Sequence, residues 1–291
     1  MAEKQFPLDI TLMCAIGLEG GLKRFDKILP KMPYDTILFV HEWNRALRDT
    51  LDKKYKHHLG PLGRAVLRMG FAPKTVSRLI DFQAEVPYRG YYYAKRFLMA
   101  YHFVVPHLYL KPYDRVLYDF GRGLSPLTPF IAQKFNNVTV FSRDNDLTND
   151  IFADTTNKMG LPAPMYEWPT SVANKRNSIY MSLGTYVYMP MEHQVQELKW
   201  AADNTEHFFI ELEYGDNQAD SGVVNNLGAQ YSGGWTNAKV GKAIGCSGAD
   251  NRWAVSRVWG TGLPGEPKML YSMPLWGQKA LINSTERFLQ R

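Results

Sequence analysis

The feature that most constrains the fold of this chain lies in its second half, where short apolar segments alternate with helical patterns. Residues 125–135 and 191–203 each place apolar side chains on one face of a helix. The apolar runs around them are short enough to be strands and occupy residues 115–120, 137–141, 178–183, 207–212, 253–259 and 268–273. Strands that alternate with helices form βαβ units, so we predict an α/β fold with a doubly wound, mostly parallel sheet.

The last two apolar runs are joined in a different way. The connecting segment "GTGLPGEP" is short and rich in Gly and Pro, which leaves no room for a helix. Two strands joined without a crossover helix pair in opposite directions, so we predict that the sheet ends in an antiparallel hairpin.

The first hundred residues have a mainly helical pattern. Residues 34–58 place Ile37, Val40 and Leu51 at helical spacing, with Asp35 as the expected N-cap. Further helices are predicted over residues 61–70, 74–86 and 88–110. We therefore divide the chain into a helical N-terminal extension, residues 1–84, and an α/β domain, residues 85–291.

Composition narrows the class of protein. The chain is 45% hydrophobic and 21% charged, which fits a folded protein with a large core. Cys14 and Cys246 do not make a disulfide framework or a metal-ligand pattern, as expected in a reducing compartment. No apolar stretch is long enough to span a bilayer, so we expect a soluble, cytoplasmic protein without a metal site.

The charge of the chain favours anionic partners only weakly. The formal net charge is +6 and the pI is about 9.1. The segment "DKKYKHH" at residues 52–58 reads most simply as a solvated helix end, and a phosphate-contacting patch is the alternative. The sequence leaves open whether the chain forms a homo-oligomer.

The segment "VLYDFGRGLSPLTPF" joins the first predicted strand to its helix. Asp119 stands at the strand end, Gly121 and Gly123 allow a sharp turn, and Ser125 is the expected N-cap with Pro126 at the first helical position. In doubly wound sheets ligands bind at this junction. A strand-to-helix turn that uses glycine only for its geometry is the alternative interpretation.

The second strand ends in the polar segment "SRDND", about twenty residues after the second glycine. A doubly wound nucleotide site places a carboxylate against ribose hydroxyls at this point. Together with "SIYMSLGTYVYMP", "MEHQVQELKWAADN" and "HFFIELEYGDN", these segments resemble the class I S-adenosylmethionine-dependent methyltransferases over roughly residues 85–276. That resemblance implies seven strands.

The resemblance also implies a set of site residues. Asp119, Gly121 and Gly123 would contact the methionine portion of S-adenosyl-L-methionine, and Ser182, Leu183 and Gly184 would line the adenine side. Two features depart from the family pattern: Ser125 occupies the third glycine slot, and Ser142 occupies the slot of the ribose-binding acid. Asp144, two residues later, is the candidate that replaces it, with Asp146 as a further candidate.

The resemblance implies methylation of a small-molecule or saccharide-like acceptor at oxygen. Methyl transfer depends mainly on holding donor and acceptor in line, and a base is needed only when the acceptor is protonated. His193 and Glu211 are the candidate catalytic residues. His193 also reads as an exposed residue of a first helical turn, and Glu211 as part of a strand end that meets solvent.

A second resemblance gives an alternative of a different class. The segment "YRGYYYAKRFLMAYHFVV" is similar to the helix before the first strand of the RNA ribose 2′-O-methyltransferases, which use a Lys-Asp-Lys-Glu set. Lys95 matches the first place, whereas Ser182 and Glu211 occupy the second and third. The alternative is therefore a catalytically degenerate relative with a structural or RNA-binding role; an NAD-dependent oxidoreductase is disfavoured.

Overall fold

The computed structural model describes residues 8–26, 34–70, 72, 75–76, 97, 115–169, 177–213, 235–245, 253–257 and 267–272. Its α-helices are α1 (Leu8–Asp26), α2 (Tyr34–Thr50), α3 (Pro61–Arg68), α6 (Leu127–Lys134), α7 (Asp146–Lys158), α8 (Met191–Asn204) and α10 (Asn237–Ala243). A π-helix, η1 (Leu51–Tyr55), and two 3₁₀ turns, η2 (Lys56–His58) and η4 (Tyr186–Tyr188), complete the helical elements of the described chain.

The strands form one sheet in the order β2-β1-β3-β4-β6-β5. The first four in this order pair in parallel, whereas β6 pairs antiparallel with both β4 and β5. The strands are β1 (Arg115–Phe120), β2 (Val138–Arg143), β3 (Ser178–Ser182), β4 (His207–Glu213), β5 (Trp253–Arg257) and β6 (Pro267–Ser272). The predicted α/β class and mostly parallel sheet are therefore confirmed.

The predicted seventh strand and the closing hairpin stay predictions. Six strands are present in the described part of the chain, and residues 258–266 between β5 and β6 lie outside it. Beyond β2, a single parallel bridge joins Phe141 to Met165. The Met165 N–H donates to the Val140 carbonyl at 2.9 Å, and the Ser142 N–H donates to the Met165 carbonyl at 2.7 Å.

The two faces of the sheet have different coverings. Tyr118, Tyr180 and Ile210 point to one face and share a core with α8 and α10. This face carries an aromatic layer in which Trp168 lies 5.4 Å from Tyr118 and 4.9 Å from Trp200, measured between ring centroids. Helix α6 covers the other face, where Thr128 reaches the carboxylate of Asp119.

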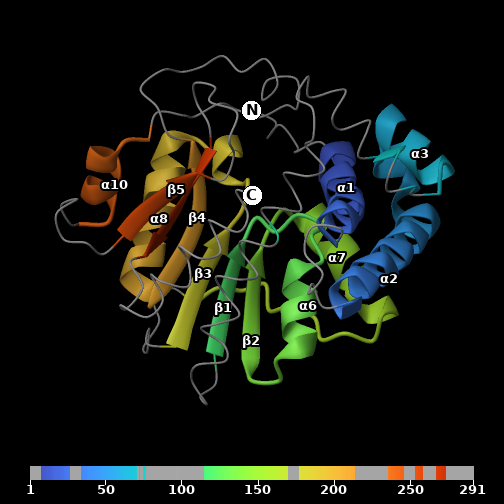
Figure 1. Ribbon diagram of the computed structural model, residues 1–291, viewed down its shortest axis with the longest axis horizontal. Coiled ribbons are helices and arrows are strands. Elements are labelled where there is room, and N and C mark those ends of the chain that lie inside the picture. Colours follow the sequence, from blue (N-terminus) through green and yellow to red (C-terminus); the bar gives the residue numbers. More distant parts are fainter. Residues whose placement is uncertain are drawn as a thin grey trace.

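The N-terminal helices share a core with the α/β part of the chain. Figure 1 shows α1, α2 and α3 together at one end of the molecule, beside α7. The Trp43 ring of α2 lies 5.0 Å from the Phe152 ring of α7 in a tilted arrangement, and the Phe39 ring lies 5.3 Å from that of Phe130 of α6. Leu124 and Ile151 belong to the same buried cluster as the apolar side chains of α1 and α3.

Local details differ from the predictions at two helix starts. Asp35 lies inside α2, which begins one residue earlier, so it is not the N-cap. Helix α6 begins at Leu127, after Pro126, although the Ser125 hydroxyl still accepts the Leu127 N–H at 3.3 Å. Pro126 has no N–H to donate, so starting the helix after it leaves no backbone donor unsatisfied at that residue.

Candidate functional site

The glycine loop, residues 121–126, lies where the connections of the sheet reverse direction. Strand β1 is flanked by β2 and β3. The chain passes from β1 through α6 to β2, and then crosses to the opposite side of β1 to form β3. The two connections therefore diverge beyond the carboxyl ends of β1 and β3, which is the position where α/β proteins bind ligands.

Both glycines of the loop have backbone conformations that favour glycine. Gly121 has φ +67° and Gly123 has φ +57°. The Gly121 N–H donates to the carbonyl of Arg143 at 2.8 Å, which ties the start of the loop to the end of β2. The loop therefore requires glycine for its geometry, as the alternative interpretation proposed.

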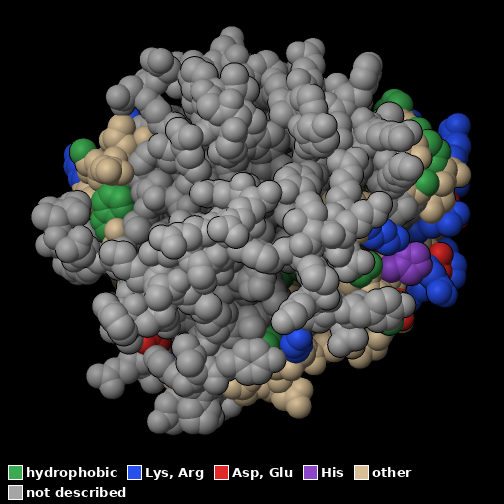
Figure 2. Space-filling model, in the orientation of Figure 1, with side chains coloured by type: hydrophobic (Ala, Val, Ile, Leu, Met, Phe, Trp, Pro, Cys, Tyr) green, Lys and Arg blue, Asp and Glu red, His purple; other side chains and the backbone are tan. Residues whose placement is uncertain are grey.

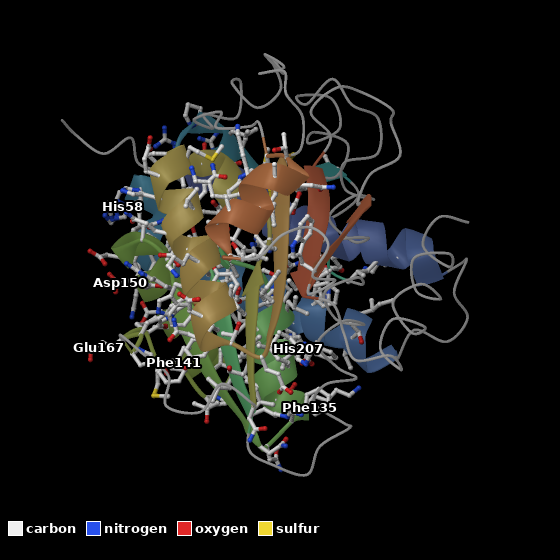
Figure 3. The ribbon with its side chains drawn as sticks, turned by 90° about the vertical axis from the view of Figure 1, so that its left-hand side faces the viewer. His58, Phe135, Phe141, Asp150, Glu167 and His207 are labelled. Carbon is white, nitrogen blue, oxygen red and sulfur yellow. The ribbon has the colours of Figure 1, made fainter. Side chains whose placement is uncertain are left out.

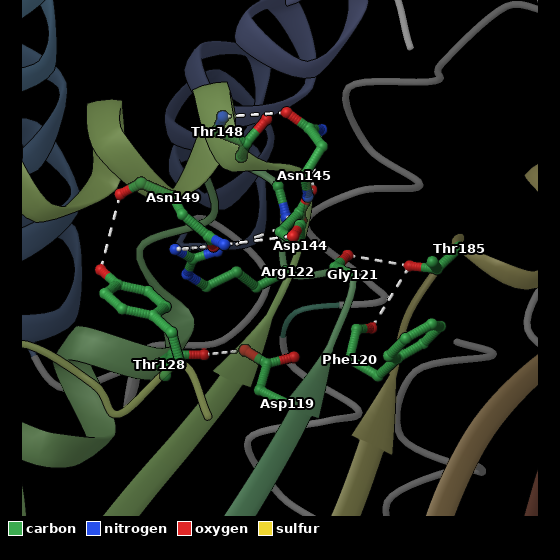
Figure 4. Close-up of polar contacts among 12 residues, drawn as sticks. Asp119, Phe120, Gly121, Arg122, Thr128, Asp144, Asn145, Thr148, Asn149 and Thr185 are labelled. Atoms are coloured by element: carbon green, nitrogen blue, oxygen red, sulfur yellow. Dashed lines mark hydrogen bonds and ion pairs between the residues drawn. The ribbon is translucent and has the colours of Figure 1, made fainter. Parts of the chain in front are cut away.

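Thr185, from the segment after β3, occupies the space over Gly121. Its hydroxyl donates to the Gly121 carbonyl at 2.8 Å, as Figure 4 shows. A Cβ atom on Gly121 would overlap the Thr185 side chain. The space left by the missing side chain of Gly121 is therefore occupied by Thr185 of the same chain.

The N-terminal helices make similar contacts with the rest of the loop. A Cβ on Gly123 would lie 2.9 Å from the Thr11 methyl group of α1. The indole N–H of Trp43 donates to the Leu124 carbonyl at 3.0 Å. No local sequence pattern indicates these contacts, because they join residues about eighty to a hundred and ten positions apart.

Asp119 points to the α6 face of the sheet and is buried. Its carboxylate accepts a hydrogen bond from the Thr128 hydroxyl. Burial raises the pKa of Asp119 to about 6, although Thr128 and Arg122 favour the ionised form. A carboxyl group with this pKa changes its protonation state just below neutral pH.

Asp144 stands one residue beyond β2, against the glycine loop. Its Oδ2 accepts the Gly123 N–H at 2.8 Å, and its Oδ1 accepts the Asn145 N–H at 2.8 Å. Burial raises the pKa of Asp144, while the Arg122 charge and the two backbone donors act in the opposite direction. Asp144 therefore lies at the end of β2 where a ribose-binding carboxylate is expected.

Ser142 lies inside β2. The register pairs it with Asp119 on the same face of the sheet. Its side chain is fully buried, and its hydroxyl has no hydrogen-bond partner among the described residues. Asp144, rather than Ser142, is therefore the residue of this segment whose polar group meets the glycine loop.

Arg122, between the two glycines, is a site residue that the sequence analysis did not identify. Its guanidinium lies 3.7 Å from the centre of the Phe152 ring and donates to the Asn149 side chain at 3.1 Å. Its Nη1 is 4.0 Å from Asp144 Oδ2. The charged character of "GRG" was the available signal, but nothing local indicated that the side chain turns inward.

The sheet separates the other candidate residues. Ser182 has the same orientation as Tyr180, toward the α8 face, and is buried, while Leu183 is half-buried just after β3. Glu211 alternates with Ile210 and Leu212, so it points to the α6 face. His193 is exposed in the first turn of α8. The structure does not bring His193 and Glu211 together.

The segment "DKKYKHH" forms ion pairs with neighbouring acids. Lys54 lies 2.9 Å from Asp154 of α7, and Lys56 lies 3.0 Å from Asp52. Figure 2 shows Lys and Arg side chains gathered at the end of the molecule formed by α2 and α3, with acidic side chains among them. The segment therefore helps to dock η1 onto α7.

Several sequence predictions concern residues outside the described chain. Lys95 and Cys246 are among them. Within the described residues, no group of His, Cys, Asp or Glu side chains has an arrangement that would hold a metal ion. None of the described helices has the length and apolar character to cross a membrane.

The chain has similarity to known proteins at the level of structure. No protein-family model matches it, and no curated protein matches it in sequence. Magnesium protoporphyrin IX methyltransferase from Synechocystis PCC 6803 with bound SAH has 13% identity and a TM-score of 0.45, covering 79% of this chain and 98% of that one. The pyocyanin biosynthetic protein PhzM has 14% identity and a TM-score of 0.40, covering 80% and 74%.

A third similar structure is the S-adenosylmethionine-dependent methyltransferase SibL in its apo form. It has 12% identity and a TM-score of 0.42, covering 87% of this chain and 74% of that one. Similarity of this degree carries no functional argument, so the function is argued from the contacts of the site itself.

Proposed function

We propose that the chain is an S-adenosyl-L-methionine-dependent methyltransferase that acts on a small-molecule or saccharide-like acceptor at oxygen. The observation that carries this proposal is the hydrogen bond from the Gly123 N–H to Asp144 Oδ2, at 2.8 Å. It joins the glycine loop after β1 to a carboxylate after β2, at the switch point of the sheet. This pairing of a glycine loop with an acid is what a ribose and its attached group require.

The hydrogen-bond capacity of Asp144 fits a ribose hydroxyl. A carboxylate accepts about four hydrogen bonds. Oδ1 accepts the backbone and side-chain N–H groups of Asn145, whereas Gly123 is the donor to Oδ2. Oδ2 therefore retains capacity for a hydroxyl donor. The cofactor would supply an electrophilic methyl group, and the protein would supply orientation.

Thr185 must turn aside before a ligand reaches the Gly121 carbonyl. A donor on the ligand would then replace the Thr185 hydroxyl, which now donates to that carbonyl. We propose that Leu183 and Ser182 flank the adenine side, and that Asp119 supports the loop through Thr128 while lying near the methionine portion. In this proposal Met165 marks the position of the seventh strand beside β2.

His193 is the better placed of the two candidate bases. As a residue in the first turn of α8, it lies at the carboxyl edge of the sheet and is exposed. Glu211 is buried on the opposite face and would act only on that side. We propose that residues 1–84 form a cap on the α/β domain, since α1 and α2 already contact the glycine loop.

Calorimetric titration with S-adenosylhomocysteine tests this proposal. The wild-type protein should bind in the micromolar range, and Asp144→Asn should weaken binding at least tenfold, about 1.4 kcal/mol. Asp203→Asn is the matched control, because Asp203 pairs with Lys199 on the exposed surface of α8. No heat with millimolar ligand would rule out the cofactor.

A second candidate function is supported by the contacts that Thr11, Trp43 and Thr185 make with the loop. In a catalytically degenerate relative, the glycine loop would serve as a docking platform for the N-terminal helices rather than for a cofactor. Neither the wild-type protein nor Thr185→Ala would then bind S-adenosylhomocysteine. An RNA-binding role predicts RNA affinity that falls steeply with added salt, and salt-insensitive or undetectable binding removes it.

A further inference from the structure

Arg122 is buried at the centre of the proposed nucleoside site, yet it faces no open crevice. Its side chain is 0% exposed. Phe152 of α7 covers one side of the guanidinium at 3.7 Å, and the Tyr166 ring lies 5.7 Å away. A guanidinium held so far from solvent is costly unless nearby groups compensate its charge.

The polar groups nearest to Arg122 belong to Asn149, near the start of α7, and to Asp144, just before that helix. Nη2 donates to the Asn149 side-chain oxygen at 3.1 Å, and the Asn149 amide donates to the Asp144 carbonyl at 3.1 Å. Nη1 lies 4.0 Å from Asp144 Oδ2. Arg122 therefore interacts with Asp144 in two ways, as Figure 4 shows. Its charge lies near the Asp144 carboxylate, and its hydrogen bond holds the Asn149 side chain, which in turn bonds the Asp144 backbone carbonyl.

The hydrogen bonds of Arg122 within the protein do not account for its burial. Nε and Nη1 have no hydrogen-bond partner in the part of the chain that the structure describes. A shorter apolar side chain would fill the position without leaving buried donors. What an arginine adds over an apolar side chain at this position is a positive charge beside Asp144.

We propose that Arg122 is the positioning residue of the nucleoside site, which fixes the Asp144 carboxylate in the orientation that receives a ribose diol. This inference rests on the proposed function, because it assigns the ligand class of the same site. Arg122 acts through Asp144 and does not contact the ligand.

The effect of the Arg122 charge on the pKa of Asp144 supports the same role. Burial raises the pKa of Asp144, and the Arg122 charge opposes that increase more than the Gly123 and Asn145 N–H groups do. The other titratable groups that face Arg122 are Asp119 from β1 and Tyr166 from the segment beside β2. Without the arginine, Asp144 would take up a proton at higher pH and lose acceptor capacity for a ribose hydroxyl.

The first test needs no ligand. Carboxyl-carbon NMR titration of the full chain measures the pKa of Asp144, assigned by comparison with Asp144→Asn and Asp119→Asn. Arg122→Met should raise that pKa by about 1 to 3 units, and Arg122→Lys should keep it near the wild-type value. An unchanged pKa in Arg122→Met would overturn the proposal. If Arg122→Met does not fold, Arg122→Gln removes the charge and can still bond Asn149.

The second test measures S-adenosylhomocysteine affinity against pH. As the pH falls, Arg122→Met should lose affinity at a higher pH than the wild-type protein does, and it should regain affinity at high pH, whereas Arg122→Lys should follow the wild-type profile. The double variant Arg122→Met/Asp144→Asn should bind within about twofold of Asp144→Asn, because the first change acts through the second residue. If the double variant weakens binding by the product of the two single factors, Arg122 acts independently of Asp144 and the proposal is overturned.

The two tests separate this proposal from the proposed function. If the wild-type protein does not bind the ligand while the Asp144 pKa still rises in Arg122→Met, the proposed function and the ribose role both fail. Normal binding by wild-type protein and by Arg122→Met across the pH range would reject the positioning role alone.

Discussion

The two ends of strand β1 each carry a buried arginine, and the two residues have different surroundings. Arg115, at the amino end, lies 3.6 Å from Glu206, and none of its guanidinium nitrogens has a hydrogen-bond partner among the described residues. Arg122, beyond the carboxyl end, bonds Asn149, stacks on Phe152 and lies beside Asp144. Burial lowers the pKa of both arginines.

The surroundings of the two arginines distinguish the amino edge of the sheet from its carboxyl edge. His207 and Phe135 mark the amino edge, on the lower part of the view in Figure 3. There the buried charge has a partner, Glu206, that is 22% exposed and can be solvated. At the carboxyl edge the partner of Arg122 is itself mostly buried and is held by the glycine loop. Buried, mutually compensating charges of this kind are common at functional sites.

The largest effect is expected where the N-terminal helices cover the carboxyl edge. Trp43→Ala should lower the free energy of unfolding by about 3 to 5 kcal/mol, because it empties a fully buried site against Phe152. Trp43→Phe keeps a ring and removes only the donor to the Leu124 carbonyl, so it should cost about 1 to 2 kcal/mol. Urea unfolding measures both, and equal losses would contradict this account.

Replacing each arginine tests whether the two buried charges contribute differently to stability. Arg122→Met should lower the free energy of unfolding by about 2 to 4 kcal/mol, because it leaves a buried carboxylate without its cation. Arg115→Met, the matched control, should change it by less than about 1 kcal/mol, because Glu206 can be solvated. Urea unfolding at neutral pH measures the difference. Similar losses at both positions would remove the distinction between the edges.

The pH dependence of stability reports on Asp119. Its folded-state pKa, about 6, lies above the ordinary value of 3.8, so the folded state binds the proton more tightly than the unfolded state does. The stability from this group is present below about pH 4 and is lost as pH rises through 6. Between pH 4 and 7.5, Asp119→Asn should therefore gain about 2 to 3 kcal/mol relative to wild type. A constant difference across this range would refute the raised pKa.

The smallest effect concerns the loop glycine. Gly121→Ala should cost about 1 to 2 kcal/mol, because its φ of +67° disfavours other residues and the new methyl overlaps Thr185. Combining it with Thr185→Gly should recover part of that loss by removing the overlap, leaving the backbone strain. Chemical unfolding of the single and double variants checks this, and full additivity would show that the two positions do not interact.

The sequence predicted the strands well because each is a short apolar run between turn residues. Arg115–Phe120 coincides with the predicted strand, and the other strands differ from theirs by one or two residues at their ends. Helix α1 was not predicted, because its glycines and its almost uniformly apolar first half hide the helical periodicity. The Thr-rich segment of α7 likewise has low helix propensity and depends on tertiary packing.

The arrangement of the candidate site could be predicted from the sequence only in part. Asp144 follows from its spacing after the glycines, and its contact with Gly123 was within reach of sequence reasoning. The orientation of Arg122 and the contacts of Thr11 and Thr185 with the loop depend on long-range packing. No local pattern encodes such contacts, since they exist only after the helices and strands have assembled.

We expect the carboxyl edge of the sheet, and not the amino edge, to bind a nucleoside cofactor. Amide-resolved NMR of the full chain during titration with S-adenosylhomocysteine tests it most directly. We predict that the amide signals of Gly121, Gly123, Asn145 and Thr185 shift on binding, while those of Arg115 and His207 do not. Shifts confined to the amino edge, or no shifts at millimolar ligand, would contradict the claim.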